Sequence, residues 1–150
     1  MNKSELLIAL WEEGRSRFSK LLEQVKETDL GKTLAPAPNS IGFLIRHIAD
    51  VELLFAKNVF NAVDVQVHAK TVIAKRDSGE WTNISELLSY QQLSYTSLKV
   101  ILRAQTEDDW ETPVTTKEFG TKTKAEALGR IVTHTTWHAG QMAIILKYSK

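Results

Sequence analysis

Two histidines stand four residues apart in the segment TKAEALGRIVTHTTWHAGQMAIILKY, which spans residues 123–148. In an α-helix, side chains at this spacing lie about 5–6 Å apart on one face, so the imidazoles of His134 and His138 can converge on one metal ion. Burying an imidazole without a partner costs about 1–3 kcal/mol, which favours a polar role for the pair over simple packing in a core. The surrounding stripe is apolar and repeats every three or four residues, as in a helical bundle. It comprises Ala127, Ile131, Ile145 and Tyr148, with the polar Gln141 beside the histidines, and is widened by Leu128, Val132, Ala139, Met142 and Leu146.

The start of this helix is marked by Thr123 and by Glu126 three residues later. This is the pattern of a capping box, in which each side chain binds the other residue's backbone N–H. The preceding polar stretch TEDDWETPVTTKEFGTKTK contains Pro113 and Gly120. We therefore predict a loop with a short hairpin around Gly120, at the rim of the histidine site.

A third imidazole lies on the apolar stripe of another predicted helix, which begins at Asn39 or Ser40 and reads IGFLIRHIADVELLFAKNVFNAV. His47 stands there between Leu44 and Val51. Together with the pair on the last helix, it would complete a site of three nitrogen ligands with room for water, which is typical of catalytic rather than structural zinc.

Asp50, three residues after His47, has two interpretations. It could accept a ring N–H from a ligating histidine. The stronger expectation is an exposed charge, because the position begins the polar face of the helix.

Two further helices complete the pattern, one from Lys3 to about Lys26 and one from near Asn83 to about Gln105. Residues 64–82 mix apolar and charged side chains and predict an extended or partly helical crossover, with His68 on its surface. We therefore expect one all-α domain over residues 1–150. It should be a four-helix bundle with a long crossover between the second and third helices.

Three polar or small residues within these helices have open interpretations. Gly14 either lets a neighbouring helix or a bound group come close or is a tolerated surface glycine. Gln91 and Tyr95 either line a pocket near the histidines or, as we favour for Tyr95, place polar groups at the edge of the bundle.

Composition excludes several classes of protein. Nineteen basic and 18 acidic residues are mixed along the chain and give a net charge of +1, so nothing indicates a nucleic-acid partner. The absence of cysteine excludes disulfides and thiolate ligands and points to the cytoplasm. The first residues form neither a signal peptide nor a membrane span. No Glu-x-x-His pair supports a di-iron site, and Thr135 stands where a zinc protease needs glutamate.

The segments SIGFLIRHIADVE (residues 40–52) and HTTWHAGQM (residues 134–142) resemble the two hallmark segments of the DinB/YfiT-like metalloenzyme family, and FGTKTKAEAL before the last helix fits as well. The resemblance implies a four-helix bundle with a non-standard helix order, often a homodimer. It also implies one divalent metal ion, nickel or zinc, held by His47, His134 and His138. Gln141 matches the family's glutamine after the histidine pair, and we expect it to orient a ligand or a bound water.

Relatives in this family resemble metal-dependent hydrolases, or S-transferases and isomerases that use a thiol such as bacillithiol or mycothiol. We therefore expect a metal-dependent transferase or hydrolase acting on a small molecule. The alternatives are a non-catalytic metal or small-ligand binding protein of the stress-response kind and a structural bundle with histidines in its core. No residue is assigned as the catalytic base; Gln141, Asp50 and Tyr95 are the pocket candidates. Trp137 or Trp11 could contribute to a dimer surface.

Overall fold

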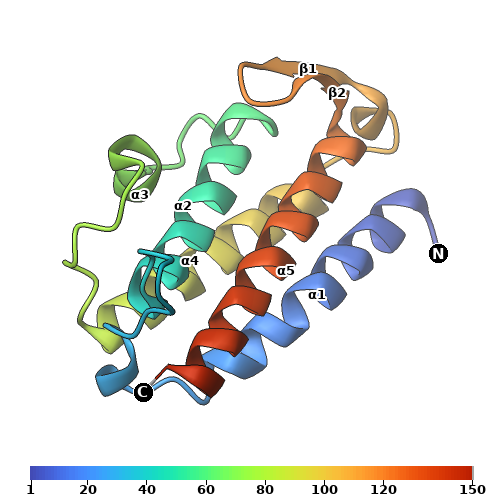
Figure 1. Ribbon diagram of the computed structural model, residues 1–150. Helices are drawn as coiled ribbons and strands as arrows, with labels where there is room; N and C mark the ends of the chain where they lie inside the picture. Colours follow the sequence, from blue (N-terminus) through green and yellow to red (C-terminus); the bar gives the residue numbers. More distant parts are fainter. Residues whose placement is uncertain (150) are drawn as a thin grey trace.

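Four helices of 18 to 25 residues form the body of the computed structural model, which describes residues 1–149 (Figure 1). These helices are α1 (Lys3–Leu22), α2 (Ile41–Asn58), α4 (Ile84–Arg103) and α5 (Lys124–Tyr148). The shorter elements are η1 (Glu27–Asp29), α3 (Lys70–Ala74), η2 (Asp109–Glu111), β1 (Pro113–Thr116) and β2 (Gly120–Thr123). The predicted all-α fold is confirmed.

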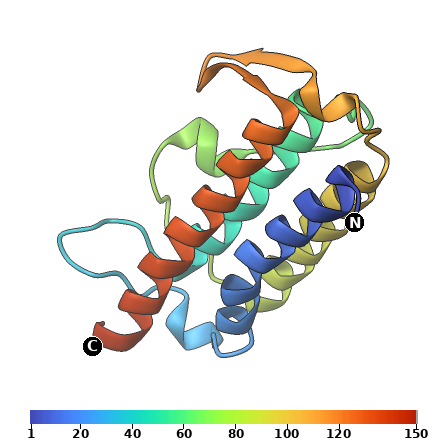
Figure 2. The same ribbon diagram turned by 90° about the vertical axis from the view of Figure 1, so that its right-hand side faces the viewer.

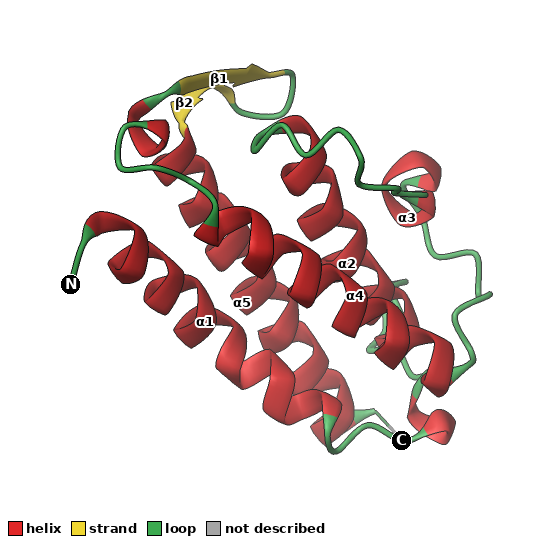
Figure 3. Cartoon of the chain, turned by 180° about the vertical axis from the view of Figure 1, so that it is seen from behind, coloured by secondary structure: helices red, strands yellow, loops and turns green. Residues whose placement is uncertain are grey.

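Parallel neighbours distinguish this bundle from an up-and-down arrangement. α1 packs against α5 and α4, and α2 packs against the same two helices. The chain runs in one direction in α1 and α5 and in the opposite direction in α2 and α4 (Figures 1 and 2). Two neighbouring parallel helices need a connection that returns along the bundle, and residues 59–83 supply it, passing outside α2 and including α3 (Figure 3). The predicted long, partly helical crossover is therefore confirmed.

Capping boxes fix the start of two helices. Thr123 and Glu126 exchange hydrogen bonds at the start of α5, as predicted, and Asn2 and Glu5 do the same for α1. α1 ends at Leu22 rather than near Lys26 as the sequence predicted. The chain turns earlier because the segment after α1 folds back, which buries Val25 and Leu30 in the core at this end of the bundle.

The loop before α5 contains the predicted hairpin. β1 and β2 pair antiparallel, with Thr116 opposite Gly120. Gly120 has a φ of +71°, a conformation that glycine adopts at no steric cost. Phe119 beside the turn packs on Phe55 of α2 with ring centroids 5.9 Å apart. The hairpin thus closes the end of the bundle where α2 ends and α5 begins (Figure 1).

The interior face of α2 is wider than the stripe expected from the sequence. The residues buried at the bundle interior include Ile45, Ile48 and Glu52, whereas His47 and Val51 are only half-buried. The apolar stripe on which His47 was predicted is therefore buried at Ile41 and Leu44 but only half-buried at His47 and Val51. α2 is buried over most of its circumference, so its apolar pattern does not define a single face. His47 lies instead at the boundary between α2 and α5.

Gly14 marks a close approach of two helices. A Cβ atom at this position would lie 2.5 Å from Cγ1 of Val132 on α5. Of the two interpretations of Gly14, the structure supports the one in which a missing side chain allows a neighbouring helix to come near.

Replacement of Gly42 by alanine should destabilise the protein, because the crossover lies directly on α2 at this point. An added Cβ would meet the backbone oxygen of Trp81 at 2.0 Å. We expect a loss of about 1–3 kcal/mol from overpacking, although alanine is favoured over glycine in a helix by about 1 kcal/mol. Gly129→Ala is the matched control, since nothing lies within 4 Å of its added Cβ. Urea unfolding of both variants tests this, and equal stability of Gly42→Ala and the parent would contradict it.

Within residues 1–149, no helix combines the length and the apolar character that crossing a lipid bilayer requires.

Candidate metal centre

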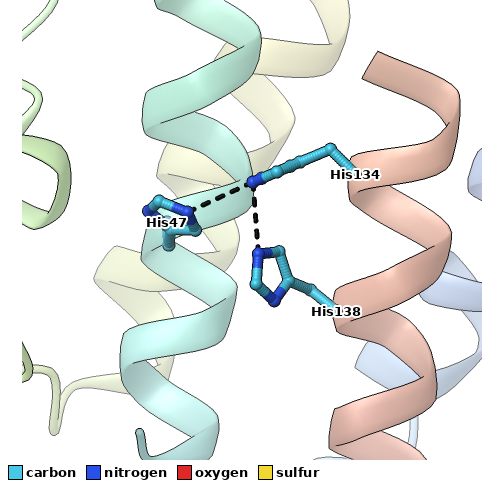
Figure 4. A group of neighbouring side chains, drawn as sticks. All are labelled: His47, His134 and His138. Carbon is cyan, nitrogen blue, oxygen red and sulfur yellow. Dashed lines mark hydrogen bonds between the residues drawn. The ribbon is translucent and has the colours of Figure 1, made fainter. Parts of the chain in front are cut away.

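The three predicted histidines meet between α2 and α5. His47 comes from α2, and His134 and His138 stand one turn apart on α5 (Figure 4). Nε2 of His134 lies 3.1 Å from Nε2 of His47 and 3.2 Å from Nε2 of His138. One nitrogen from each ring lies within 4.8 Å of the other two, and all three side chains are half-buried.

The arrangement of these nitrogens fits a metal ion. Three unprotonated Nε2 atoms facing one another would direct their lone pairs into the same space, which is unfavourable unless a cation lies between them. Two nitrogens bound to zinc at about 2.0–2.1 Å with tetrahedral angles are about 3.3–3.4 Å apart. The observed separations of 3.1 and 3.2 Å are close to this spacing. The three-histidine group can therefore hold a divalent metal ion.

Thr71 and Asp50 determine which nitrogen of His47 carries its proton. The Thr71 hydroxyl donates to Oδ2 of Asp50 at 2.7 Å, and the Thr71 backbone N–H donates to the same oxygen at 3.1 Å. Nδ1 of His47 lies 3.1 Å from Oγ1 of Thr71. Because the only hydroxyl proton is committed to the carboxylate, Oγ1 must accept from Nδ1–H of His47. Nε2 of His47 is then unprotonated and available as a ligand.

Asp50 is fully buried, so the expectation of an exposed charge is wrong. Its second oxygen, Oδ1, accepts from Nε of Arg46 and from the hydroxyl of Tyr90, both at 2.9 Å. Burial and the nearby Asp50 carboxylate raise the pKa of Tyr90 above its ordinary value, so the hydroxyl remains a donor. Asp50 contacts no histidine directly and acts on His47 through Thr71.

The remaining two histidines differ in what their outer nitrogens contact. Oε1 of Gln141 lies 2.6 Å from Nδ1 of His138, so it can accept the ring N–H and leave Nε2 free. The structure thus places Gln141 against a candidate ligand. Nδ1 of His134 has no hydrogen-bond partner among residues 1–149.

The site keeps its imidazoles neutral. Burial, together with the smaller effect of the neighbouring His138, lowers the pKa of His47 to about 4 and that of His134 to about 3. Burial also lowers the pKa of His138, against the opposing effect of its hydrogen bond to Gln141. Metal ions bind the neutral ring, so protons compete little with a metal at neutral pH.

The metal-free protein should lose stability as the pH falls below 6.5. In the unfolded chain His47 and His134 protonate near pH 6.5, but in the folded chain only near 4 and 3. The stabilising difference is fully present above 6.5 and decreases as the pH falls toward 4 and 3. At pH 5.5 each of the two histidines should lower the free energy of unfolding by up to about 1.4 kcal/mol relative to its value above pH 6.5. Urea unfolding in the presence of a chelator at pH 7.5 and at pH 5.5 measures this loss of stability. The double variant His47→Gln/His134→Gln should show a flatter pH dependence, and an equally steep one would contradict this explanation.

Other candidates from the sequence lie away from the cluster. Tyr95 stacks on Trp11 and donates to Glu12 at 3.0 Å, which places it at the α1–α4 edge, as favoured. Gln91 is buried and binds Arg15 rather than a histidine. The His68 side chain is exposed.

The two tryptophans proposed for a dimer surface differ in exposure. Trp11 is 1% exposed and belongs to the core, whereas Trp137 is 70% exposed.

Sequence reasoning missed Thr71, Arg46 and Tyr90 as neighbours of the site. Arg46 stands four residues before Asp50, a spacing that signals an ion pair along a helix. Thr71 lies in the crossover, where no helical register indicates a direction.

A helical bundle that brings together three histidines from two of its helices is a candidate metalloprotein. The chain belongs to the DinB superfamily, whose sequence profile matches residues 10–142. No protein of curated function matches the sequence.

Solved structures share the fold. A mycothiol-dependent maleylpyruvate isomerase is 22% identical with a TM-score of 0.72; the match covers 93% of this chain and 60% of the isomerase. A histidine-to-alanine mutant of a mycothiol-dependent maleylpyruvate isomerase gives 21% identity and a TM-score of 0.71, with the same coverage. A conserved protein from Enterococcus faecalis is 17% identical with a TM-score of 0.67, covering 98% of this chain and 99% of that one. This chain therefore spans about 60% of the isomerase's length.

Proposed function

We propose that this protein is a metal-dependent enzyme in which His47, His134 and His138 hold one divalent ion, nickel or zinc. The observation that carries the proposal is the convergence of three Nε2 atoms, with separations of 3.1 and 3.2 Å from His134 to the other two. Three neutral ligands leave the charge of the ion uncompensated and a coordination position open. A divalent ion bound here would lower the pKa of a coordinated water or thiol and so supply a nucleophile near neutral pH.

Neighbouring side chains hold the histidine rings of this site in position. Thr71 and Gln141 accept the Nδ1–H groups of His47 and His138 and so orient both rings. Phe43 stacks on His47 with ring centroids 5.6 Å apart and an interplanar angle of 9°, which fixes the ring plane and covers one of its faces. Held in this way, the ligands need little reorganisation when a substrate binds.

Among reactions, we infer that transfer of a small-molecule thiol, of the bacillithiol or mycothiol type, fits best, followed by hydrolysis. Support comes from the fold shared with a mycothiol-dependent isomerase. The chain contains no cysteine, so any thiol in the reaction would have to come from outside.

Elemental analysis of the untagged protein tests the metal site. We expect about one equivalent of nickel or zinc per chain, lost in His47→Ala and in His134→Ala. His68→Ala is the matched control, since this fourth histidine is exposed and outside the cluster. Absence of metal after incubation with each ion would overturn the proposal.

A substrate panel tests the reaction. Thiol conjugation and ester hydrolysis should disappear with chelator and with His134→Ala. Tight metal binding with no turnover would favour the second candidate, a non-catalytic metal or small-ligand binding protein. The homodimer that the family resemblance implies is tested by analytical ultracentrifugation.

A further inference from the structure

A small pocket borders the histidine cluster on the side of His134. Its volume is about 200 Å³, and its lining comes from α2, α5 and the turn between β1 and β2. Val51, Phe55 and Trp137 form apolar walls, and Arg130 and Glu118 are the charged groups. Ligand pockets for drug-sized molecules usually enclose about 300–1,000 Å³, so this one suits a smaller molecule.

His134 is the one histidine of the three whose Nδ1 has no partner among residues 1–149, and this residue lines the pocket. If Nε2 binds a metal, as proposed above, Nδ1 must carry the proton and becomes a hydrogen-bond donor. The equivalent donors of His47 and His138 each have an oxygen acceptor from the protein. An acceptor atom on a ligand would give Nδ1–H of His134 the hydrogen-bond partner that the other two rings already have.

Arg130 provides a positive charge one turn from His134 on α5. Its guanidinium lies 3.1 Å from Glu118, and the two side chains are 47% and 58% exposed. An ion pair this exposed contributes about 0–1 kcal/mol, so it does not hold Arg130 strongly. A guanidinium binds a carboxylate through two parallel hydrogen bonds, which allows a ligand to displace Glu118.

We propose that this pocket binds a small carboxylate with an apolar body. The carboxylate lies between Arg130 and Nδ1–H of His134, and the apolar part packs on Val51, Phe55 and Trp137. This assigns a substrate class to the proposed enzyme, and the role of His134 rests on that proposed function. Recognition by Arg130 does not require the metal.

Titration of phenylacetate into zinc-loaded and metal-free protein, followed by calorimetry, tests the assignment. Arg130→Gln should weaken binding about tenfold, because a charge-assisted hydrogen bond is lost. Glu118→Gln should tighten it several-fold, because Arg130 is released from its competitor. Both variants break the same ion pair, so a purely structural role would shift affinity in the same direction in each. Phenylacetamide, which lacks the charge, should bind more weakly than phenylacetate and respond to neither variant.

The proposal is overturned if the two variants change affinity in the same direction or not at all, or if phenylacetamide binds as tightly as phenylacetate. Binding that requires zinc but ignores Arg130 and Glu118 would place the carboxylate on the metal and also overturn it. Failure of the proposed function is separate: a protein that takes up no metal but binds phenylacetate through Arg130 would retain the carboxylate site. A protein that binds metal but no carboxylate would contradict only the proposed carboxylate site.

Discussion

Replacement of Glu52 by alanine is expected to lower the free energy of unfolding by about 3–5 kcal/mol, because it leaves a charge buried without its partner. Arg15 on α1 and Glu52 on α2 are 5% and 1% exposed. Arg15 donates to Glu52 and, at 2.7 Å, to Oε1 of Gln91, while the Ser94 hydroxyl donates to Glu52 at 2.8 Å. The guanidinium also lies over the ring of Tyr95, 5.1 Å from its centroid. The network connects α1, α2 and α4, and loss of the Glu52 carboxylate leaves the Arg15 guanidinium and the Ser94 hydroxyl without this acceptor.

Urea unfolding of Glu52→Ala measures this loss. The double variant Arg15→Met/Glu52→Leu is the informative comparison, because replacing both charges by apolar groups of similar volume is often neutral or stabilising. Its recovery of stability would show that the stranded charge causes the loss. A cost below about 1 kcal/mol for Glu52→Ala would contradict this explanation, since it would mean that water or another residue compensates Arg15.

Replacement of Thr71 by valine should lower the affinity for a divalent metal about 10–100-fold. Valine has nearly the same shape as threonine but cannot accept the Nδ1–H of His47, so the ring loses the contact that keeps Nε2 unprotonated and aimed at the site. Thr71→Ser, which keeps the hydroxyl, should bind metal like the parent. Competition with a chelating dye measures the affinities.

The same variants have a second readout in the metal-free protein. Nitrogen chemical shifts of the imidazole should show His47 protonated at Nδ1 in the parent and in Thr71→Ser, and a mixture of tautomers in Thr71→Val. A merely structural role of Thr71 would change stability without changing the tautomer. Unchanged metal affinity in Thr71→Val would refute the role assigned to this hydroxyl.

The three histidines could be predicted to meet because their positions follow from regular helices. His134 and His138 lie one turn apart, and His47 lies on the face of α2 that meets α5. Helical periodicity places such side chains on a face of the helix, although most of the circumference of α2 is buried and its pattern does not define a single interior face. The capping residues at Thr123 and the hairpin at Gly120 were predictable for the same reason, since both are local.

The buried charges could not be placed in the same way. Asp50 was expected on the polar face of its helix, and Arg15 and Glu52 were not singled out, because a single sequence does not reveal a partner on another helix. A signal did exist for Arg15, which stands between the buried Trp11 and Phe18 at spacings of four and three. Thr71 gave none, because the crossover has no repeat that fixes where a side chain lies.

The separation of the histidines along the chain gives the proposed metal a second consequence. His47 and His134 are 87 positions apart, and α2 and α5 contact each other only through the folded structure. An ion held by both would act as a reversible cross-link in a chain that has no cysteine with which to form a permanent one. A permanent link over a loop of this length is worth about 4–5 kcal/mol by loop-closure entropy. The free energy of unfolding would then rise with the concentration of available metal, independently of any reaction that the protein catalyses.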